Sequence, residues 1–386
     1  MKKILLISLI TSSVFSQTSN IFEPIDLFDL EYVSNTEISP SGDKVLYQRN
    51  YNDIMTDQSF SNIWLINYDG TNNRPITTGN YKDNSPKWSN QGDKFIFQSN
   101  RDSKSQIFLF DLKNNSIQKL TNFQYSIQSI KWSPDDNYIL FSSFIDSKRK
   151  SLIKMPEKPK GAKWNDPPVE ISDLNYRYDS SGYRKPGEVQ FFTIPVSGGT
   201  PRQISNIKPE KRAGQAEWLG NDKIIFSANL NDDSDYNTNN SEIYILSLES
   251  GKHEALTSRN GPDSSPKVSN DNSMIAYLGY DDEYLGYQQN SIYVMKPDGS
   301  SKFKIQLNLD RNISNIYWSA DDKRIYFQFD DKGITKIGST TLEGKFQTEV
   351  DQIGGLSFSR PYSGGFFSLS KNNRYSFTYG TSYNPA

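Results

Sequence analysis

The sequence alternates short apolar runs with polar turns along most of its length, and one such unit returns seven times. In each unit a turn rich in Ser, Asn, Asp and Gly is followed by an apolar run of strand length, as at residues 95–97 and 325–327. These turn residues tolerate the positive φ that a tight reversal between antiparallel strands requires. The seven turns begin at Ile38, Trp88, Trp132, Trp218, Val268, Trp318 and Leu369.

The spacing of these turns predicts a propeller. Successive turns lie about 50 residues apart, with one longer interval of 86, and a blade of four short strands needs about 40–50 residues. We therefore predict an all-β fold, a seven-bladed β-propeller with the last blade incomplete, in which the apolar runs are the innermost strands. The chain is too short after residues 375–377 for two more strands, and residues 24–36 are expected to supply one of them.

The long interval predicts a loop insertion over residues 148–188, between repeats three and four. This segment contains five prolines and no copy of the turn, which favours a loop over an eighth blade. One part of it combines aromatic area with charge, a mix that contact surfaces favour. We expect this part either to contact substrate or a neighbouring domain, or to pack internally and face solvent. Its residues are Tyr176, Arg177, Tyr178, Asp179 and Tyr183.

The N-terminus and the composition indicate an exported protein. Two lysines precede a short apolar run, which predicts a signal peptide over residues 1–16 and a propeller over residues 21–386. The chain has no cysteine, so it has neither disulfides nor a thiol for lipid attachment, and we expect it in the periplasm or secreted. The formal net charge of −2 and the absence of a visible basic patch exclude an obvious nucleic-acid partner. No apolar stretch reaches the ~20 residues of a membrane span.

The sequence shows neither a serine triad nor a zinc site of the usual kind. A serine triad needs a histidine base and usually a G-x-S-x-G elbow; the elbow is absent, and the one histidine, His253, is predicted to be a solvated turn residue. One histidine and no cysteine exclude the usual zinc site. The acidic stretches 233–239 and 281–283 are predicted to be solvated loops. We therefore assign no catalytic residue, no metal and no cofactor.

The repeat itself resembles a known type. Residues 85–102 resemble the repeat shared by TolB-like propellers and by the propellers of prolyl oligopeptidase-family serine peptidases. Residues 174–183 and 279–288 look like loops of the acylaminoacyl-peptidase and dipeptidyl-peptidase-like branch of those peptidases. The resemblance covers residues 24–386, nearly the whole chain.

The resemblance implies that the propeller and a separate catalytic domain have different functions. In these peptidases the propeller limits access of substrates, and an α/β-hydrolase domain with a Ser-Asp-His triad follows it; that domain is absent from this chain. We expect a substrate-gating domain of a secreted or periplasmic serine peptidase that cleaves short peptides, inactive by itself, with the hydrolase domain as its partner. The alternative is a non-enzymatic TolB-like protein-binding propeller. A TolB-like protein has an α/β domain before its propeller, and the first repeat at Ile38 leaves no room for one.

Overall fold

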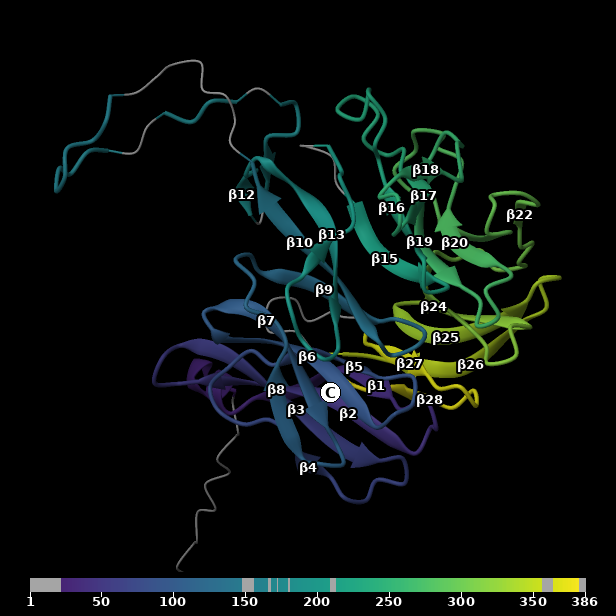
Figure 1. Cartoon of the computed structure of the whole chain (residues 1–386). Helices are drawn as coiled ribbons and strands as arrows, with labels where there is room; N and C mark the ends of the chain where they lie inside the picture. Colours follow the sequence, from purple (N-terminus) through teal and green to yellow (C-terminus); the bar gives the residue numbers. More distant parts are fainter. Residues whose placement is uncertain are drawn as a thin grey trace, which may run out of the picture.

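The computed structural model describes residues 22–147, 156–165, 168–171, 173–179, 181–208, 213–355 and 364–381. These residues form six four-stranded antiparallel sheets around a common axis and two two-stranded sheets (Figure 1). The predicted signal peptide lies outside the described residues. No helix in the described part of the chain is long and apolar enough to cross a membrane.

Each four-stranded sheet is one blade, and its strands follow the chain order from the axis outward. A short 3-10 helix, η1 (Pro24–Phe28), precedes the first blade. The first blade consists of β1 (Glu31–Ile38), β2 (Lys44–Asp53), β3 (Gln58–Asn67) and β4 (Arg74–Pro75). The second consists of β5 (Asn84–Trp88), β6 (Lys94–Asp102), β7 (Lys104–Asp111) and β8 (Ser116–Lys119). The third consists of β9 (Ile127–Trp132), β10 (Tyr138–Asp146), β13 (Gly187–Pro195) and β14 (Arg202–Gln203).

The remaining blades repeat this order. The fourth blade consists of β15 (Ala213–Leu219), β16 (Lys223–Ala228), β17 (Glu242–Ser247) and β18 (His253–Ala255). The fifth consists of β19 (Asp263–Val268), β20 (Ile275–Gly279), β21 (Ser291–Met295) and β22 (Phe303–Lys304). The sixth consists of β23 (Ile313–Trp318), β24 (Arg324–Asp331), β25 (Ile334–Thr341) and β26 (Phe346–Ile353). The two-stranded sheets are β11 (Arg177–Tyr178) with β12 (Gly182–Tyr183), and β27 (Phe367–Leu369) with β28 (Tyr375–Phe377).

The predicted all-β propeller is confirmed, but the described residues form six complete blades rather than seven. The seventh repeat forms only the β27–β28 pair, because no third strand pairs with β28 within the described ranges. The expectation that residues 24–36 complete this repeat is wrong. Those residues form η1 and the first part of β1, whose partner is β2 of the first blade.

The apolar runs after the turns are the second strands of the blades, not the innermost ones as predicted. In β6, five consecutive residues are buried, whereas the innermost strand β5 alternates partly buried and buried positions. A second strand is paired along both edges and covered on both faces by neighbouring blades, so even the polar Gln98 and Ser99 of β6 are buried. An innermost strand leaves one edge toward the axis, which explains its more polar pattern.

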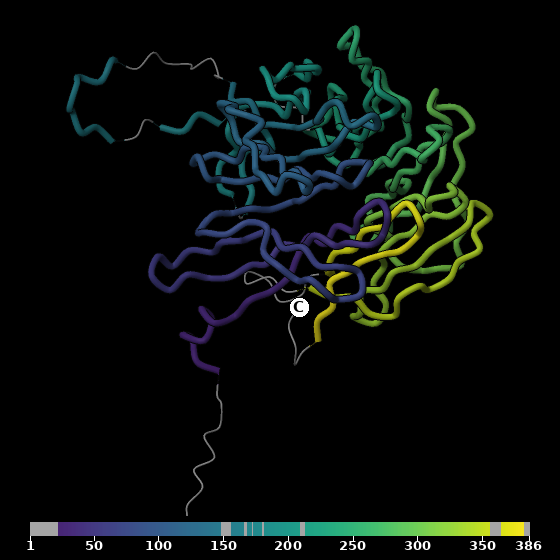
Figure 2. The backbone as a smooth tube through the Cα atoms, turned by 60° about the horizontal axis from the view of Figure 1, so that its bottom comes forward, coloured from purple at the N-terminus to yellow at the C-terminus, as the bar shows by residue number. Residues whose placement is uncertain are grey.

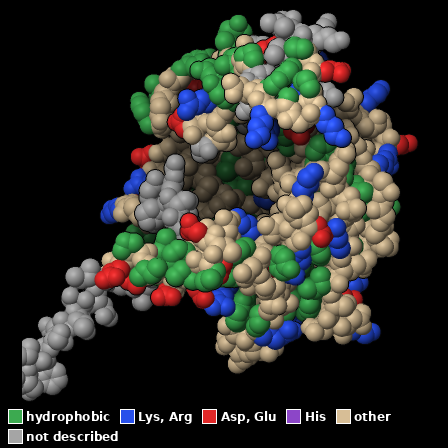
Figure 3. Space-filling model, turned by 90° about the vertical axis from the view of Figure 1, so that its left-hand side faces the viewer, with side chains coloured by type: hydrophobic (Ala, Val, Ile, Leu, Met, Phe, Trp, Pro, Cys, Tyr) green, Lys and Arg blue, Asp and Glu red, His purple; other side chains and the backbone are tan. Residues whose placement is uncertain are grey.

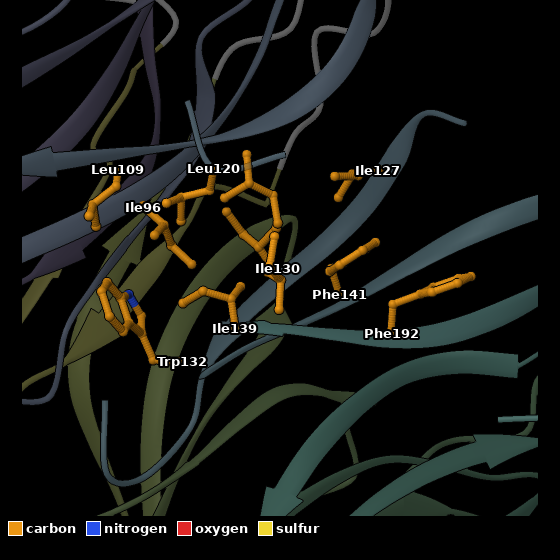
Figure 4. Packing of buried hydrophobic residues seen from close by; sticks show 11 residues of the cluster. Ile96, Leu109, Leu120, Ile127, Ile130, Trp132, Ile139, Phe141 and Phe192 are labelled. Atoms are coloured by element: carbon orange, nitrogen blue, oxygen red, sulfur yellow. The ribbon is translucent and has the colours of Figure 1, made fainter. Parts of the chain in front are cut away.

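The core consists of six apolar clusters, each lying between successive sheets. The cluster between the second and third blades joins side chains of β6, β7, β9, β10 and β13 (Figure 4). Its labelled members are Ile96, Leu109, Leu120, Ile127, Ile130, Trp132, Ile139, Phe141 and Phe192. The β27–β28 pair packs on the sixth blade in the same way, with Phe367 beside Ile337 and Ile353. In its packing, the seventh repeat therefore behaves as the inner half of a blade.

The ring closes through polar contacts. Figure 2 shows the last described strands beside the first, and the Ile38 N–H donates to the Ser368 hydroxyl at 2.8 Å. The Lys371 N–H donates to the Pro40 carbonyl at 3.1 Å. Among the described residues no apolar cluster joins β1 to β27, so hydroxyl and backbone hydrogen bonds hold this junction.

The turns between first and second strands are tied from blade to blade. Asp136 and Asp322 occupy the left-handed region, both with φ of 57°, and their carboxylates accept the N–H groups of Asn90 at 2.8 Å and Asn270 at 2.9 Å. Glycine would adopt this φ more readily, but it has no side chain to reach the preceding blade. Asp at this turn therefore combines a tolerated conformation with a connection between blades.

A second recurring hydrogen bond lies at the outer part of the second, third and fourth blades. A Thr or Ser hydroxyl after the fourth strand donates to a buried polar residue of the third strand, which is Gln106, Gln190 or Glu242. Glu242 is only 4% exposed. Burial, reinforced by the nearby Asp263 carboxylate, raises the pKa of Glu242 from 4.5 to about 7. The fourth blade thus holds a carboxyl group where the second and third blades hold a neutral amide.

We expect Glu242→Gln to stabilise the protein above pH 7. Because the folded state holds the Glu242 proton more tightly than the unfolded state, the contribution of Glu242 to stability falls as pH rises from about 4.5 to about 7. Glutamine does not titrate, so the variant lacks this loss of stability. Its gain in unfolding free energy over the unsubstituted protein should therefore be larger at pH 8 than at pH 4.5, by on the order of 2–3 kcal/mol. Urea unfolding across this range measures it. Glu254→Gln, at an exposed position of β18, serves as control; a gain that does not vary with pH would contradict the assignment.

Candidate functional site

The innermost strands bring one position of every repeat to the propeller axis. This position directly precedes the first residue of each turn motif, and its side chains line a cavity of about 440 Å³, here called the axial cavity. Because side chains alternate along a strand, the motif residue points into the core between blades and its predecessor points to the axis. The seven axial residues are Glu37, Lys87, Lys131, Glu217, Lys267, Tyr317 and Ser368.

Tryptophan side chains fix the register of these strands. The indole Nε1–H of Trp88 donates to the carbonyl of Glu37, and that of Trp132 donates to the carbonyl of Lys87, both at 2.9 Å. Trp318 donates to the carbonyl of Lys267 at the same distance. In each case the acceptor is the axial residue of the preceding blade, so the same bond that joins two blades also positions a charged side chain at the axis.

The axial cavity carries a surplus of positive charge. Its lining includes four lysines, one of which is Lys371 at the rim, and two glutamates, so its formal charge is +2, whereas the whole chain has −2. The molecular face in Figure 3 is deeply hollowed, with Lys and Arg side chains around the hollow. No basic patch is visible along the sequence because these lysines are separated by 44 or more residues.

Ion pairs organise the cavity. Lys87 Nζ lies 2.6 Å from Glu37 Oε2. Glu217 Oε1 accepts from both Lys131 and Lys267, the latter at 2.5 Å. Two ammonium groups therefore share one carboxylate oxygen, and this group of three has a net charge of +1.

The shared carboxylate shifts the titration of all three groups. Burial by itself would raise the pKa of Glu217, but the two lysines outweigh burial and lower that pKa to about 2. Burial lowers the pKa of Lys131 to about 8, against the attraction of Glu217 and together with the repulsion from Lys267. For Lys267, the Glu217 carboxylate outweighs burial and raises the pKa above its usual value. Lys131 is therefore the cation of this group that loses its proton most easily.

The two ends of the cavity differ in chemistry. One end is lined by the amide side chains of Asn35, Gln128 and Gln215. The other is lined by the turn residues Asn90 and Asn270 and by Lys371. A charged centre thus lies between two rims that can exchange hydrogen bonds with a polar ligand.

The predicted contact residues of the insertion lie outside the axial cavity. The insertion connects β10 with β13, the second and third strands of the third blade, and its described residues 156–165 extend away from the blades (Figures 1 and 2). All five predicted residues belong to the β11–β12 hairpin and its turn, where all are exposed: Tyr176, Arg177, Tyr178, Asp179 and Tyr183. The rings of Tyr176 and Tyr183 lie 6.3 Å apart. The structure thus groups these residues on one exposed hairpin.

The remaining candidates are surface groups. His253 begins the outermost strand β18 instead of lying in a turn, and it is exposed, with its ring 5.8 Å from that of Tyr244. Residues 233–239 lie in the connection between β16 and β17, and 281–283 in the connection between β20 and β21. Within the described ranges, no three His, Cys, Asp or Glu side chains are grouped as a metal site would require.

The axial lysines were not among the predicted site residues, although the sequence contains a signal for them. Lys87, Lys131 and Lys267 occupy the same position of their repeats. Within a strand, a charged residue directly before a buried tryptophan or a partly buried valine indicates a side chain that faces away from the core. Aligning the repeats by this position would have revealed the cluster.

The chain is similar to peptidases. It is 25% identical over 352 residues to dipeptidyl-peptidase 5 of Porphyromonas gingivalis, a match that covers 86% of this chain and 50% of that protein. The chain therefore spans about half the length of this relative. The predicted resemblance to peptidase propellers is confirmed. No protein-family model matches the sequence.

Solved structures share the fold. Acylaminoacyl peptidase of Pyrococcus horikoshii has a TM-score of 0.63 at 18% identity, over 84% of this chain and 47% of that one. The propeller domain of the Trilobed protease from Pyrococcus furiosus has a TM-score of 0.54 at 17% identity, over 83% and 85%. An oligogalacturonate lyase from Vibrio parahaemolyticus has a TM-score of 0.61 at 11% identity, over 92% and 93%. Proteins of different activities share this fold, so fold alone does not define the activity.

We expect Lys131 to titrate near pH 8. In the protein labelled with ¹³C at lysine side chains, the signal that disappears in Lys131→Gln should move with an apparent pKa of about 8. Glu217→Gln should lower this pKa further, because it removes the carboxylate that favours the charged ammonium. Titration near the ordinary value of 10.5 in the unsubstituted protein would contradict this description of the cavity.

Proposed function

We propose that this chain is the substrate-gating propeller of an exported serine peptidase that cleaves short peptides. The observation that carries the proposal is the similarity to dipeptidyl-peptidase 5 over nearly all of this chain and only half of the relative. A catalytic α/β-hydrolase domain would occupy the other half, as the resemblance implies. Residues 1–16 would direct export to the periplasm or beyond.

The axial cavity has the size that such gating requires. Its volume of about 440 Å³ lies within the range of about 300–1,000 Å³ usual for small-ligand sites. A short extended peptide fits such a space, whereas a folded domain does not. The inward-facing charges and amides would contact a peptide that enters.

One face of the propeller is suited to the hydrolase domain. Strand direction alternates within each blade, so all connections between second and third strands lie on the same face, and β1 begins there. The longest of these connections are the β10–β13 insertion and residues 229–241 and 280–290. They expose large aromatic side chains, including Tyr236 at 85% and Tyr287 at 79% exposure. Exposed aromatic groups in such density favour a protein contact.

We place the five insertion residues in this contact. Tyr176, Arg177, Tyr178, Asp179 and Tyr183 would touch the hydrolase domain or a substrate held between the domains. Their hairpin is ordered by the Arg184 N–H, which donates to the Tyr176 carbonyl at 2.8 Å. A short paired hairpin presents its aromatic rings at lower entropic cost than an unpaired loop.

We also infer a seven-bladed ring for the longer protein. The β27–β28 pair packs on the sixth blade as inner strands do, and β28 has one unpaired edge among the described residues. Two further strands from the following segment would complete this blade and cover the edge.

The isolated chain should show no peptidase activity. Chromogenic dipeptidyl, aminoacyl and acylaminoacyl substrates should remain uncleaved by this chain, whereas the protein with its following segment should cleave at least one class. The coding sequence beyond Ala386 should continue for roughly 250 residues, a usual domain size, with a G-x-S-x-G elbow. A stop codon close to Ala386 would instead support the TolB-like binding propeller. Turnover of a substrate by this chain alone would refute the proposal that catalysis belongs to a separate hydrolase domain.

In the longer protein, Tyr183→Ala should weaken the contact between domains. Removing an exposed aromatic side chain at a contact costs about 1–2 kcal/mol, so we expect the catalytic domain to become several-fold more sensitive to limited proteolysis. Tyr138→Ala is the matched control, since Tyr138 is 45% exposed at the start of β10, on the opposite face. Equal proteolysis of the two variants would argue against the hairpin as an interdomain contact.

A further inference from the structure

We propose that the axial cavity binds the C-terminal carboxylate of a peptide, with Lys131, Lys267 and Lys87 as the cationic groups that receive it. This inference rests on the proposed function, since it names the feature of a short peptide that the propeller recognises. It concerns binding by the present chain, so it can be measured without any catalytic domain.

The charge distribution supports an anionic ligand. The cavity has four lysines against two glutamates, within a chain whose formal net charge is −2. Low-dielectric walls of a cavity concentrate the field of such a surplus and raise the local concentration of anions. Since the rest of the chain provides no net attraction, an anion is drawn specifically to this place.

The hydrogen-bonding geometry leaves donors for a second carboxylate. Lys131 and Lys267 bond the same oxygen of Glu217, and each ammonium group has three N–H donors. At least one donor on each lysine is therefore available to a ligand that approaches from the cavity. Lys87 is near enough to Lys131 to influence its pKa, so it extends the same positive region toward Glu37.

The lining of one rim suits the backbone of a peptide. Gln128 and Gln215 are exposed at one rim. Their amides can both donate to and accept from the backbone of an extended peptide, whose carboxylate would reach the lysines at the centre.

The test is calorimetric titration of this chain with N-acetyl-triglycine, which ends in a free carboxylate, and with its C-terminal amide. We expect the carboxylate form to bind at least about tenfold more tightly, with an affinity that falls as ionic strength rises. Lys131→Gln lowers the cavity charge by one and should weaken binding about tenfold. At a pH low enough for Lys131 to keep its proton without the Glu217 carboxylate, Glu217→Gln raises the cavity charge by one and should strengthen binding several-fold.

The two substitutions should change the binding affinity in opposite directions, so a general loss of structure cannot produce both results. A variant that merely unfolds loses affinity, so an increase in Glu217→Gln supports the proposal even where Lys131→Gln proves unstable. Lys323→Gln is the control for a loss of one positive charge, because Lys323 lies in a turn with 81% of its side chain exposed. It should leave the affinity unchanged.

Three outcomes would overturn the proposal. These are equal binding of the acid and the amide, no change in affinity in Glu217→Gln, and inorganic phosphate that binds as tightly as the peptide acid. The last result would show a general anion site instead of a peptide site. A stop codon after Ala386 would refute the peptidase assignment and leave the measured binding intact, whereas an active longer protein whose propeller shows no preference for the acid would refute only this inference.

Discussion

The hydrogen bond from a tryptophan indole to the carbonyl of the preceding blade joins three pairs of blades and sets which side chains face the axis there. The bonds of Trp88, Trp132 and Trp318 have the same length and the same type of acceptor. An indole has only one donor and costs free energy when buried without a partner, so each bond restricts how two blades can slide past each other. A shift by one residue would exchange the core-facing and axis-facing side chains of an entire strand. The positions of Lys87 and Lys267 at the axis follow from this register.

Charges at the axis are tolerated because they are arranged around shared partners. Lys131 and Glu217 are only 23% and 17% exposed, and partly buried ions lose hydration that a partner must replace. Glu217 stabilises two ammonium groups with a single oxygen, which leaves one positive charge without its own counter-ion. An apolar axis would be easier to stabilise, so retention of the surplus charge is consistent with a binding role, and that surplus is what the proposed carboxylate would neutralise.

Much of the fold could be predicted from the sequence, because the turn chemistry repeats at fixed spacing. Gly42, Gly92 and the Asp residues of later turns indicate a tight reversal after a serine, and these turns place the repeats correctly along the chain. The order of the strands within a blade was harder to predict from the sequence. The most apolar run was taken as innermost, whereas Phe95 and Phe97 are buried because their strand lies between two others and two neighbouring blades.

The site was not predictable by the same means, because its residues are brought together only by ring closure. Lys87 and Lys267 are 180 residues apart in the sequence and approach each other because successive blades rotate about one axis. The net charge of the chain even suggests the wrong sign for the charge of the cavity, because the whole chain has −2 and the cavity has +2. In closed repeat folds, charge is better counted by repeat position than along the chain.

The two faces of the propeller differ in how readily they accept inserted residues. On the face of the tight turns, Asp136 and Asp322 bind the backbone of the preceding blade, so an inserted residue would break a contact between blades. The connections between second and third strands include much longer ones, and a segment of about 40 residues is accommodated there between β10 and β13. Loops that lie beyond a rigid scaffold can vary without loss of the core. A protein partner is therefore best accommodated on the long-loop face, while the axis, fixed by the tryptophan bonds, is suited to a small ligand of defined charge.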